Sequence, residues 1–139
     1  MDRKDFLKST FLICGAIVTG ASILEGCSKN GGSTPATVSV NFTLDLNASS
    51  NSALKTVGGY VESNNAIVIR TATNTYIALS NVCTHQGCTV SYSSQAKDIY
   101  CPCHGGTYDL NGNVTGGPPP SALQVFKTSL NGNILTVTS

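Results

Sequence analysis

The chain has 139 residues, enough for one domain of ordinary size and too few for two once an N-terminal leader is set apart. Charged residues make up only 11%, and eight Lys and Arg against seven Asp and Glu leave a formal charge of +1. So sparse and balanced a set of charges argues against a nucleic-acid-binding protein and against a charged disordered tail. Fourteen Gly, no Trp and abundant Val, Ile, Thr, Ser and Asn favour short strands over helices.

Residues 1–26 have the features of an export leader. A basic start precedes an apolar run over residues 11–24, which is shorter than the about 20 residues of a membrane span and suits a signal peptide. The segment DRKDFLK at 2–8 resembles a twin-arginine export signature with Lys4 in place of the second arginine. Leu24-Glu25-Gly26-Cys27 resembles a lipoprotein box, in which Cys27 would become the lipidated first residue of the mature chain.

Three fates of the leader are compatible with this pattern: lipidation at Cys27, cleavage without a lipid, or retention as an uncut anchor. Each places the domain outside the cytoplasm, in the periplasm or cell envelope, where disulfides persist. Residues 27–36, CSKNGGSTPA, then form a Gly/Ser-rich tether before a domain at 37–139. Since the nine residues 28–36 that follow Cys27 reach at most about 30 Å, an anchored domain would stay close to its membrane.

The rest of the chain predicts an all-β domain. Apolar and polar residues alternate over 38–46, which is the two-residue period of a half-buried strand. AIVIR at 66–70 and TYIALS at 75–80 predict a strand pair that turns at Thr73-Asn74. Asn111-Gly112 and Asn131-Gly132 predict two further hairpins, because Asn and Gly tolerate the positive φ angles of tight turns.

Two loops contain both histidines of the chain and four of its six cysteines: CTHQGC at 83–88 and CPCHGGTYD at 101–109. A disulfide framework would pair these four cysteines and leave the histidines incidental. Mononuclear zinc could take any four of the six groups, although zinc ribbons generally use two Cys-x-x-Cys knuckles. Blue copper usually needs an axial Met, and Met1 is the only methionine. None of these three alternatives uses all six groups.

The two loops resemble the cluster-binding loops of Rieske iron–sulfur proteins at nearly every position, and Gly116-Gly117-Pro118-Pro119-Pro120 is similar to that family's proline loop. The resemblance implies a Rieske-type antiparallel β-sandwich of stacked small sheets, with two cluster-binding loops and a proline loop. It implies one 2Fe-2S cluster ligated by Cys83 and Cys101 on one iron and by His85 and His104 on the other. It also implies a disulfide between Cys88 and Cys103, which is typical of the high-potential branch.

Charge explains why such a centre accepts an electron readily. Two ferric ions, two sulfides and two thiolates sum to zero when the imidazoles are neutral, whereas four thiolates would leave a double negative charge. Rieske potentials accordingly span about −150 to +300 mV, against about −400 mV for plant-type ferredoxins. Because imidazole also ionises, an electron can travel together with a proton, as quinol oxidation requires.

The resemblance assigns roles to five neighbours of the ligands. Tyr108 matches a tyrosine whose hydroxyl reaches a ligand sulfur, and Pro118 and Pro119 belong to the cover. Gly106 stands where quinol-oxidising members carry a serine that donates to a bridging sulfide, and Gln86 replaces an apolar residue that faces quinone. We therefore expect a potential below that of quinol-oxidising relatives, and we expect Gly106→Ser to raise it.

The sequence thus predicts an extracytoplasmic electron-transfer protein, a subunit of an oxidoreductase rather than a complete enzyme. It would relay single electrons in a membrane respiratory chain, with a cytochrome or a membrane quinol-oxidising complex as partner and with no nucleic acid. Two alternatives remain at this point. One is the small relay subunit of a periplasmic molybdenum oxidase, as in arsenite oxidases, and the other is a non-redox, zinc-binding surface lipoprotein.

Overall fold

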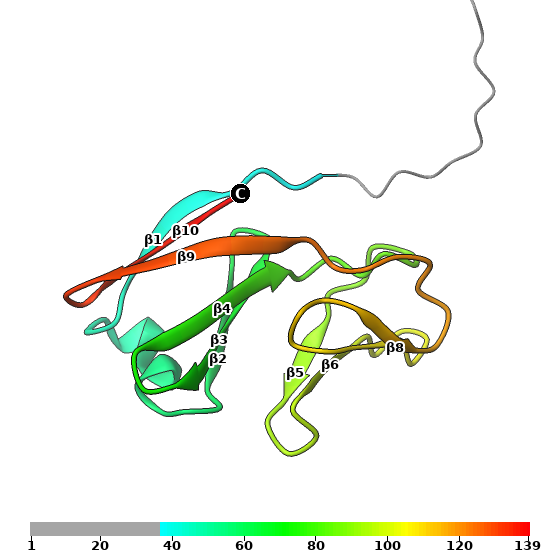
Figure 1. The fold of residues 1–139 in the computed structure, drawn as a ribbon, viewed down its shortest axis with the longest axis horizontal. Helices are drawn as coiled ribbons and strands as arrows, with labels where there is room; N and C mark the ends of the chain where they lie inside the picture. The colour runs from blue at the N-terminus through cyan, green and yellow to red at the C-terminus, as the bar shows by residue number, and fades with distance from the viewer. Residues whose placement is uncertain (1–36) are drawn as a thin grey trace, which may run out of the picture. The chain divides into compact units, whose positions relative to one another are not determined.

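The computed structural model describes residues 37–139. The predicted leader, the tether and Cys27 lie outside these residues. The described chain forms ten strands and one 3-10 helix, η1 (Ser49–Lys55), in two antiparallel sheets (Figure 1), which confirms the all-β prediction. Within this range no helix is long and apolar enough to cross a membrane.

The larger sheet has the strand order β1 (Asn41–Asp45), β10 (Ile134–Thr138), β9 (Val125–Asn131), β4 (Thr75–Ser80), β3 (Ala66–Ala72) and β2 (Tyr60–Ser63). Only two residue pairs, Ala78↔Phe126 and Leu79↔Val125, join β4 to β9. The sheet therefore consists of two three-stranded halves, β1-β10-β9 and β4-β3-β2, joined by a short ladder. Both halves and η1 contribute to one apolar cluster, which includes Leu54, Val68 and Leu135.

The strand pairs follow the turn residues. The turn predicted at Thr73-Asn74 is confirmed, and Asn74 has the positive φ of 53° that such a turn requires. The β9–β10 hairpin is also confirmed, but its turn lies one residue later than predicted, at Gly132-Asn133, because Asn131 pairs with Ile134. A hairpin that the sequence analysis missed joins β2 to β3 through Asn64-Asn65, both at positive φ.

The first strand begins later than its alternation predicts. β1 starts at Asn41, and Val38 lies outside the ladder. The side-chain amide of Gln124 takes the place of a neighbouring strand there: its Oε1 accepts the Val38 N–H at 2.8 Å and its Nε2 donates to the Val38 carbonyl at 2.9 Å. The start of the described chain is therefore held by one side chain from the segment before β9.

The smaller sheet carries the Cys/His loops. Its strand order is β5 (Ser91–Ser93), β6 (Asp98–Tyr100), β7 (Thr107–Tyr108) and β8 (Val114–Gly116). The loop at 83–88 leads into β5, and the loop at 101–106 joins β6 to β7. The β7–β8 hairpin turns through Gly112 at a φ of 84°, as predicted from Asn111-Gly112.

A second apolar cluster joins this smaller sheet to β3. Ala66 and Val68 of β3 point into the first cluster, whereas Ile67 and Ile69 point into the second. All four side chains are fully buried, because β3 lies between two cores. The second cluster also contains the side chains of the cysteines that begin the two Cys/His loops, so the candidate centre is built directly onto the core.

Candidate metal centre

The first Cys/His loop (83–88) is closed by two backbone hydrogen bonds. The Cys83 N–H donates to the Cys88 carbonyl at 2.8 Å, and the Gly87 N–H donates back to the Cys83 carbonyl at 2.9 Å. Gly87 has a φ of +76°, a conformation that residues with a Cβ rarely adopt. Within this tight turn the ring of His85 lies against that of His104 in the second loop.

The second Cys/His loop (101–106) repeats the same backbone pattern. The Cys101 N–H donates to the Gly106 carbonyl at 2.7 Å, the Gly105 N–H donates to the Cys101 carbonyl at 3.0 Å, and Gly105 has a φ of +73°. When Cys83 is matched to Cys101 and Gly87 to Gly105, His85 of the first loop occupies the same position as Cys103 of the second. Two loops with different sequence patterns therefore present their side chains from matching turns, which the spacing alone did not reveal.

The two imidazoles meet at the tip of the loops. The rings of His85 and His104 lie 4.8 Å apart between centroids, edge to face at 88°. The Nδ1 atom of His85 is buried and has no hydrogen-bond partner among residues 37–139. An unpartnered buried nitrogen is costly, and metal coordination would satisfy it. His104, in contrast, is exposed.

The four cysteines divide into two pairs. Cys88 and Cys103 form a disulfide that joins the loops, as the resemblance implied. Cys83 and Cys101 are free thiols, each with only 2% of its surface exposed. The sulfur of Cys101 lies within 4.8 Å of both disulfide sulfurs. Because those two sulfurs are already bonded to each other, Cys101 is the one member of that sulfur trio available to a metal.

The two free thiols have different electrostatic environments. Burial raises the pKa of Cys83, but the hydrogen bonds from Tyr108, from Cys101 and from the backbone of His85 and Gln86 together outweigh it, so the pKa lies below the usual value. Burial and the neighbouring Cys83 raise the pKa of Cys101. Burial and the bond to Cys83 also raise the pKa of Tyr108, which stays a hydroxyl donor. The Cys83 sulfur is thus surrounded by groups that stabilise negative charge.

Tyr108 occupies the position that the sequence predicted. Its side chain is fully buried, and its hydroxyl lies 3.3 Å from the Cys83 sulfur. Thr84, which the sequence analysis did not single out, contacts the same hydroxyl through its backbone N–H and its side chain, each at 3.2 Å. The Thr84 hydroxyl also donates to the backbone carbonyl of Ser121 at 2.7 Å, across 37 residues of sequence. No local sequence signal marks so distant a contact.

The proline loop (116–120) lies on the second Cys/His loop. Pro119 is buried, whereas Pro118 is exposed. A Cβ atom built on Gly106 would lie 2.4 Å from Pro119 Cγ, and one built on Gly117 would lie 2.8 Å from Gly106 Cα. The expectation that Gly106→Ser simply adds a hydroxyl donor therefore needs correction, since any side chain at this position displaces Pro119.

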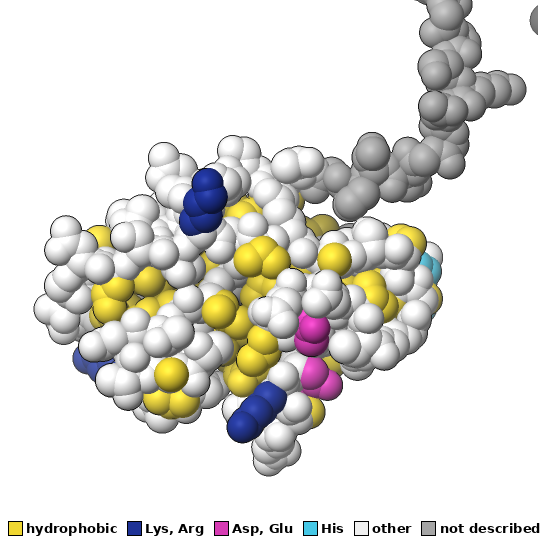
Figure 2. All heavy atoms as spheres, viewed as in Figure 1, with side chains coloured by type: hydrophobic (Ala, Val, Ile, Leu, Met, Phe, Trp, Pro, Cys, Tyr) yellow, Lys and Arg dark blue, Asp and Glu magenta, His cyan; other side chains and the backbone are white. Residues whose placement is uncertain are grey.

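The loop tips form an exposed edge of the domain. Gln86 and His104 are both exposed there. Figure 2 shows histidine atoms at one edge of the visible face beside hydrophobic side chains, with the few charged groups scattered elsewhere. A partner could thus approach the candidate centre at a surface with little charge.

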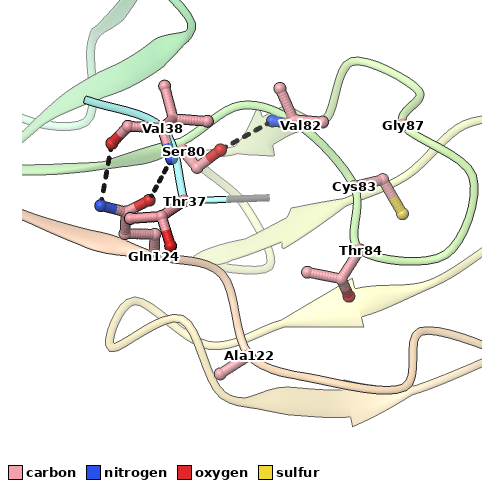
Figure 3. Close-up of a pocket in the computed structure, with 9 residues that line it drawn as sticks. All are labelled: Thr37, Val38, Ser80, Val82, Cys83, Thr84, Gly87, Ala122 and Gln124. Atoms are coloured by element: carbon pink, nitrogen blue, oxygen red, sulfur yellow. Dashed lines mark hydrogen bonds between the residues drawn. The ribbon is translucent and has the colours of Figure 1, made fainter. Parts of the chain in front are cut away.

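A cavity of about 470 Å³ lies beside the first Cys/His loop (Figure 3). The segment around Cys83 and Thr84 forms one wall, and Val38, Gln124 and Ala122 form the other. Two hydrogen bonds, one donated by each residue, join Val38 and Gln124 in the lining of this cavity. The cavity leaves open space along the side of Thr84.

The structure places the four predicted ligands in two matched loops, with Cys83 next to Cys101 and the rings of His85 and His104 edge to face. Two buried free thiols, one buried unpartnered imidazole nitrogen and one exposed imidazole provide the donor set of two sulfurs and two nitrogens that a Rieske cluster uses. The residues present therefore fit such a cluster.

Comparisons with known proteins agree with this geometry. Residues 42–127 match the family described as Rieske [2Fe-2S] domain. The chain is 38% identical over 60 residues to the cytochrome b6-f complex iron-sulfur subunit of Chlorobaculum thiosulfatiphilum, covering 43% of this chain and 33% of that protein. It is 41% identical over 59 residues to the corresponding subunit of Prochlorococcus marinus (strain AS9601), covering 42% and 33%. The chain thus spans about a third of the length of these relatives.

Solved structures show the same fold. The plasma membrane Rieske protein PetC3 from Synechocystis PCC 6803 superposes with a TM-score of 0.55 at 26% identity, over 74% of this chain and 100% of that chain. The ferredoxin of carbazole 1,9a-dioxygenase from Nocardioides aromaticivorans IC177 superposes at 0.50 and 21% identity, over 73% and 98%. Because the family match covers more than half of the sequence, the chain belongs to the Rieske family and is an iron–sulfur electron-transfer protein that carries a Rieske 2Fe-2S cluster.

Proposed function

We propose that this protein relays single electrons in a membrane respiratory chain, as an extracytoplasmic subunit or partner of a quinol-oxidising complex. The observation that carries the proposal is the asymmetric pair of imidazoles, one with a buried unpartnered nitrogen and one exposed at the loop tips. An exposed ligand beside a buried site gives a partner a short path to the centre. The likeness to iron-sulfur subunits of cytochrome b6-f complexes supports the same role.

In this proposal Cys83 and Cys101 hold one iron, and His85 and His104 hold the other. The cluster, when bound, supplies a centre that accepts and releases one electron. The chain's own residues set the conditions for that exchange. Tyr108 donates a hydrogen bond toward the Cys83 sulfur, and the disulfide between Cys88 and Cys103 keeps the two loops joined.

The cover over the site excludes water from one side. Pro119 packs against the backbone of the second Cys/His loop, and the two cysteine ligands are almost fully buried. Low exposure strengthens the electrostatic effect of each nearby donor on the charge of the site. The surroundings therefore favour a potential above that of ferredoxins with only cysteine ligands.

One observation favours a second role. Gln86 is exposed at the loop tip and presents a polar amide where quinol-oxidising relatives present an apolar side chain. A polar tip is better suited to a soluble redox protein than to a quinone. The alternative is therefore a small relay subunit of a periplasmic molybdenum oxidase.

Cross-linking of the tagged full-length chain in native membranes distinguishes these roles. Capture of a cytochrome b-type subunit, together with reduction of the cluster by quinol, is the outcome expected for the respiratory role. Capture of a molybdenum subunit instead, with no reduction by quinol, would overturn that role in favour of the alternative. The EPR spectrum of the reduced protein provides a separate check that the cluster is present. Single substitutions of each histidine by Ser then test whether both histidines are ligands.

Membrane attachment is proposed to occur through Cys27, which lies outside the described residues. If Cys27 is the lipidated terminus, the mature chain begins there, and Cys27→Ala yields an uncut precursor with altered sorting. Mass spectrometry of the mature protein measures this directly. An intact residue 1, or a soluble chain that begins at another position, would contradict lipidation.

A further inference from the structure

Three polar groups contact the buried hydroxyl of Tyr108, and a fourth group is linked to it through Thr84. The Cys83 sulfur lies 3.3 Å from it, and the N–H and the hydroxyl of Thr84 each lie 3.2 Å from it. The fourth group is one step removed, because the Thr84 hydroxyl also lies 2.7 Å from the backbone carbonyl of Ser121, directly after the proline loop. This chain of contacts links the cover of the site to one of its sulfurs.

The hydrogens in this chain can be assigned from donor capacity alone. A carbonyl only accepts, so the single hydroxyl hydrogen of Thr84 is directed to Ser121. The Thr84 N–H donates to the Tyr108 oxygen. The one remaining hydrogen is that of the Tyr108 hydroxyl, and it has two acceptors at nearly equal distances, the Cys83 sulfur and the Thr84 hydroxyl oxygen.

We propose that Thr84 is a positioning residue that sets how strongly Tyr108 donates to the Cys83 sulfur, and that it does so under the control of the proline loop. The proposal rests on Cys83 being a cluster ligand. While the Thr84 hydroxyl is bonded to Ser121, its oxygen competes for the Tyr108 hydrogen and weakens the bond to sulfur.

Displacement of the proline loop would reverse this competition. Without the Ser121 carbonyl, the Thr84 hydroxyl is free to rotate and to donate to the Tyr108 oxygen, and the phenolic hydrogen is then left to Cys83. Thr84 lines the cavity beside the first Cys/His loop (Figure 3), and its hydroxyl hydrogen can be redirected by rotation about the Cβ–Oγ bond alone. A partner that presses on the proline loop would therefore make the cluster easier to reduce.

Thr84→Val tests the proposal, because valine keeps the branched shape and removes the competing oxygen. We expect the midpoint potential, measured by protein-film voltammetry, to rise. We also expect Tyr108→Phe to lower the potential by roughly twice as much in the Thr84→Val background as in the wild type, because the shared hydrogen is then committed to sulfur. Thr84→Ser should keep the wild-type potential, and Thr107→Val, which removes a hydroxyl that accepts a hydrogen bond from Thr115, is the matched control.

A second measurement reads the bond itself. Replacement of water by D2O should shift the iron–thiolate stretching bands of the resonance Raman spectrum more in Thr84→Val than in the wild type. An unchanged or lowered potential, additive effects of Thr84→Val and Tyr108→Phe, or an equal isotope shift in both proteins would each overturn the proposal. If Thr84→Val and Thr84→Ala both lose the cluster while Thr84→Ser keeps it, the side chain is required for loop assembly and the tuning role is refuted. Absence of the cluster EPR signal in the wild type would instead refute the ligand assignment.

Discussion

Pro119 and Gly106 are in such close contact that a side chain at Gly106 has no room beside the proline ring. A Cβ on Gly106 would lie 2.4 Å from Pro119 Cγ and 2.8 Å from its Cδ. The ring of a proline moves only with its backbone, so this clash is not relieved by a rotamer change. The second Cys/His loop and the proline loop therefore pack as one unit through a glycine.

Gly106→Ser is expected to loosen the cover of the cluster. The serine Cβ pushes Pro119 away, water reaches the site, and the cluster is lost faster on dilution into buffer than in the wild type. Decay of the visible absorption measures this loss. The double variant Gly106→Ser with Pro119→Ala removes the clashing ring atoms, so any rise in potential from the serine hydroxyl should show there. A single Gly106→Ser variant as stable as the wild type would contradict the clash.

Tyr108→Phe should lower the midpoint potential. The hydroxyl lies 3.3 Å from the Cys83 sulfur and stabilises its negative charge, which grows when the cluster is reduced. A hydrogen bond to a charged group contributes about 1.5–3 kcal/mol. If its energy differs between the oxidised and reduced cluster by about half of that amount, the midpoint potential shifts by on the order of 50 mV. Tyr92→Phe is the matched control, since Tyr92 is buried in the same cluster and packs on Tyr60. Equal shifts in the two variants would rule out a specific effect on sulfur.

Loss of the disulfide should release the cluster while the domain remains folded. Cys88 and Cys103 close a loop with a sequence separation of 15, and a bridge of this span contributes about 3 kcal/mol in chain-entropy terms. Cys88→Ser, Cys103→Ser and the double variant should lose iron at similar, increased rates, because each breaks the same bond. Circular dichroism should still show the β-sheets. Labelling of both thiols in the native oxidised protein would show that the bridge is absent.

The β7–β8 turn should stabilise the folded protein at neutral pH and lose this contribution at acidic pH. Asp109 accepts hydrogen bonds from the Asn113 side chain and from the backbone N–H groups of Asn111 and Asn113, and these lower its pKa. A lowered pKa in the folded state stabilises the protein above the unfolded-state value, about 3.9, and this contribution is lost as pH falls through the lower folded value.

Thermal unfolding of the wild type and of Asp109→Ala tests this turn. The wild type should have the higher melting temperature near neutral pH, and the difference should shrink below pH about 4. Asp98→Ala is the control, because it removes a carboxylate from β6 of the same sheet and leaves the β7–β8 turn intact. A difference that stays constant with pH would show that the hydrogen bonds do not depend on the charge of Asp109.

The fold was predictable where the pattern is local. The turn at Thr73-Asn74 follows from residues adjacent in sequence, and the structure confirms it. The four consecutive apolar residues that begin β3 indicated a strand, but not that β3 lies between two cores. Gln124, which holds Val38 from 86 positions away, had no signal at all. Contacts of this kind depend on which strands become neighbours, and alternation within one strand carries no such information.

The sequence by itself determined the candidate ligands Cys83, His85, Cys101 and His104, because the resemblance of their two loops to those of Rieske proteins assigns them to a 2Fe-2S cluster. Ligand type and number must match the cluster whatever the surrounding fold, so they are visible in the residues alone. Only the tertiary structure decided what surrounds those ligands. Pro119 fills the space that a side chain at Gly106 would need, and Thr84 competes for the hydrogen of Tyr108. Such effects depend on distances of a few tenths of an ångström between segments far apart in the chain, and these distances are set only when the sheets pack.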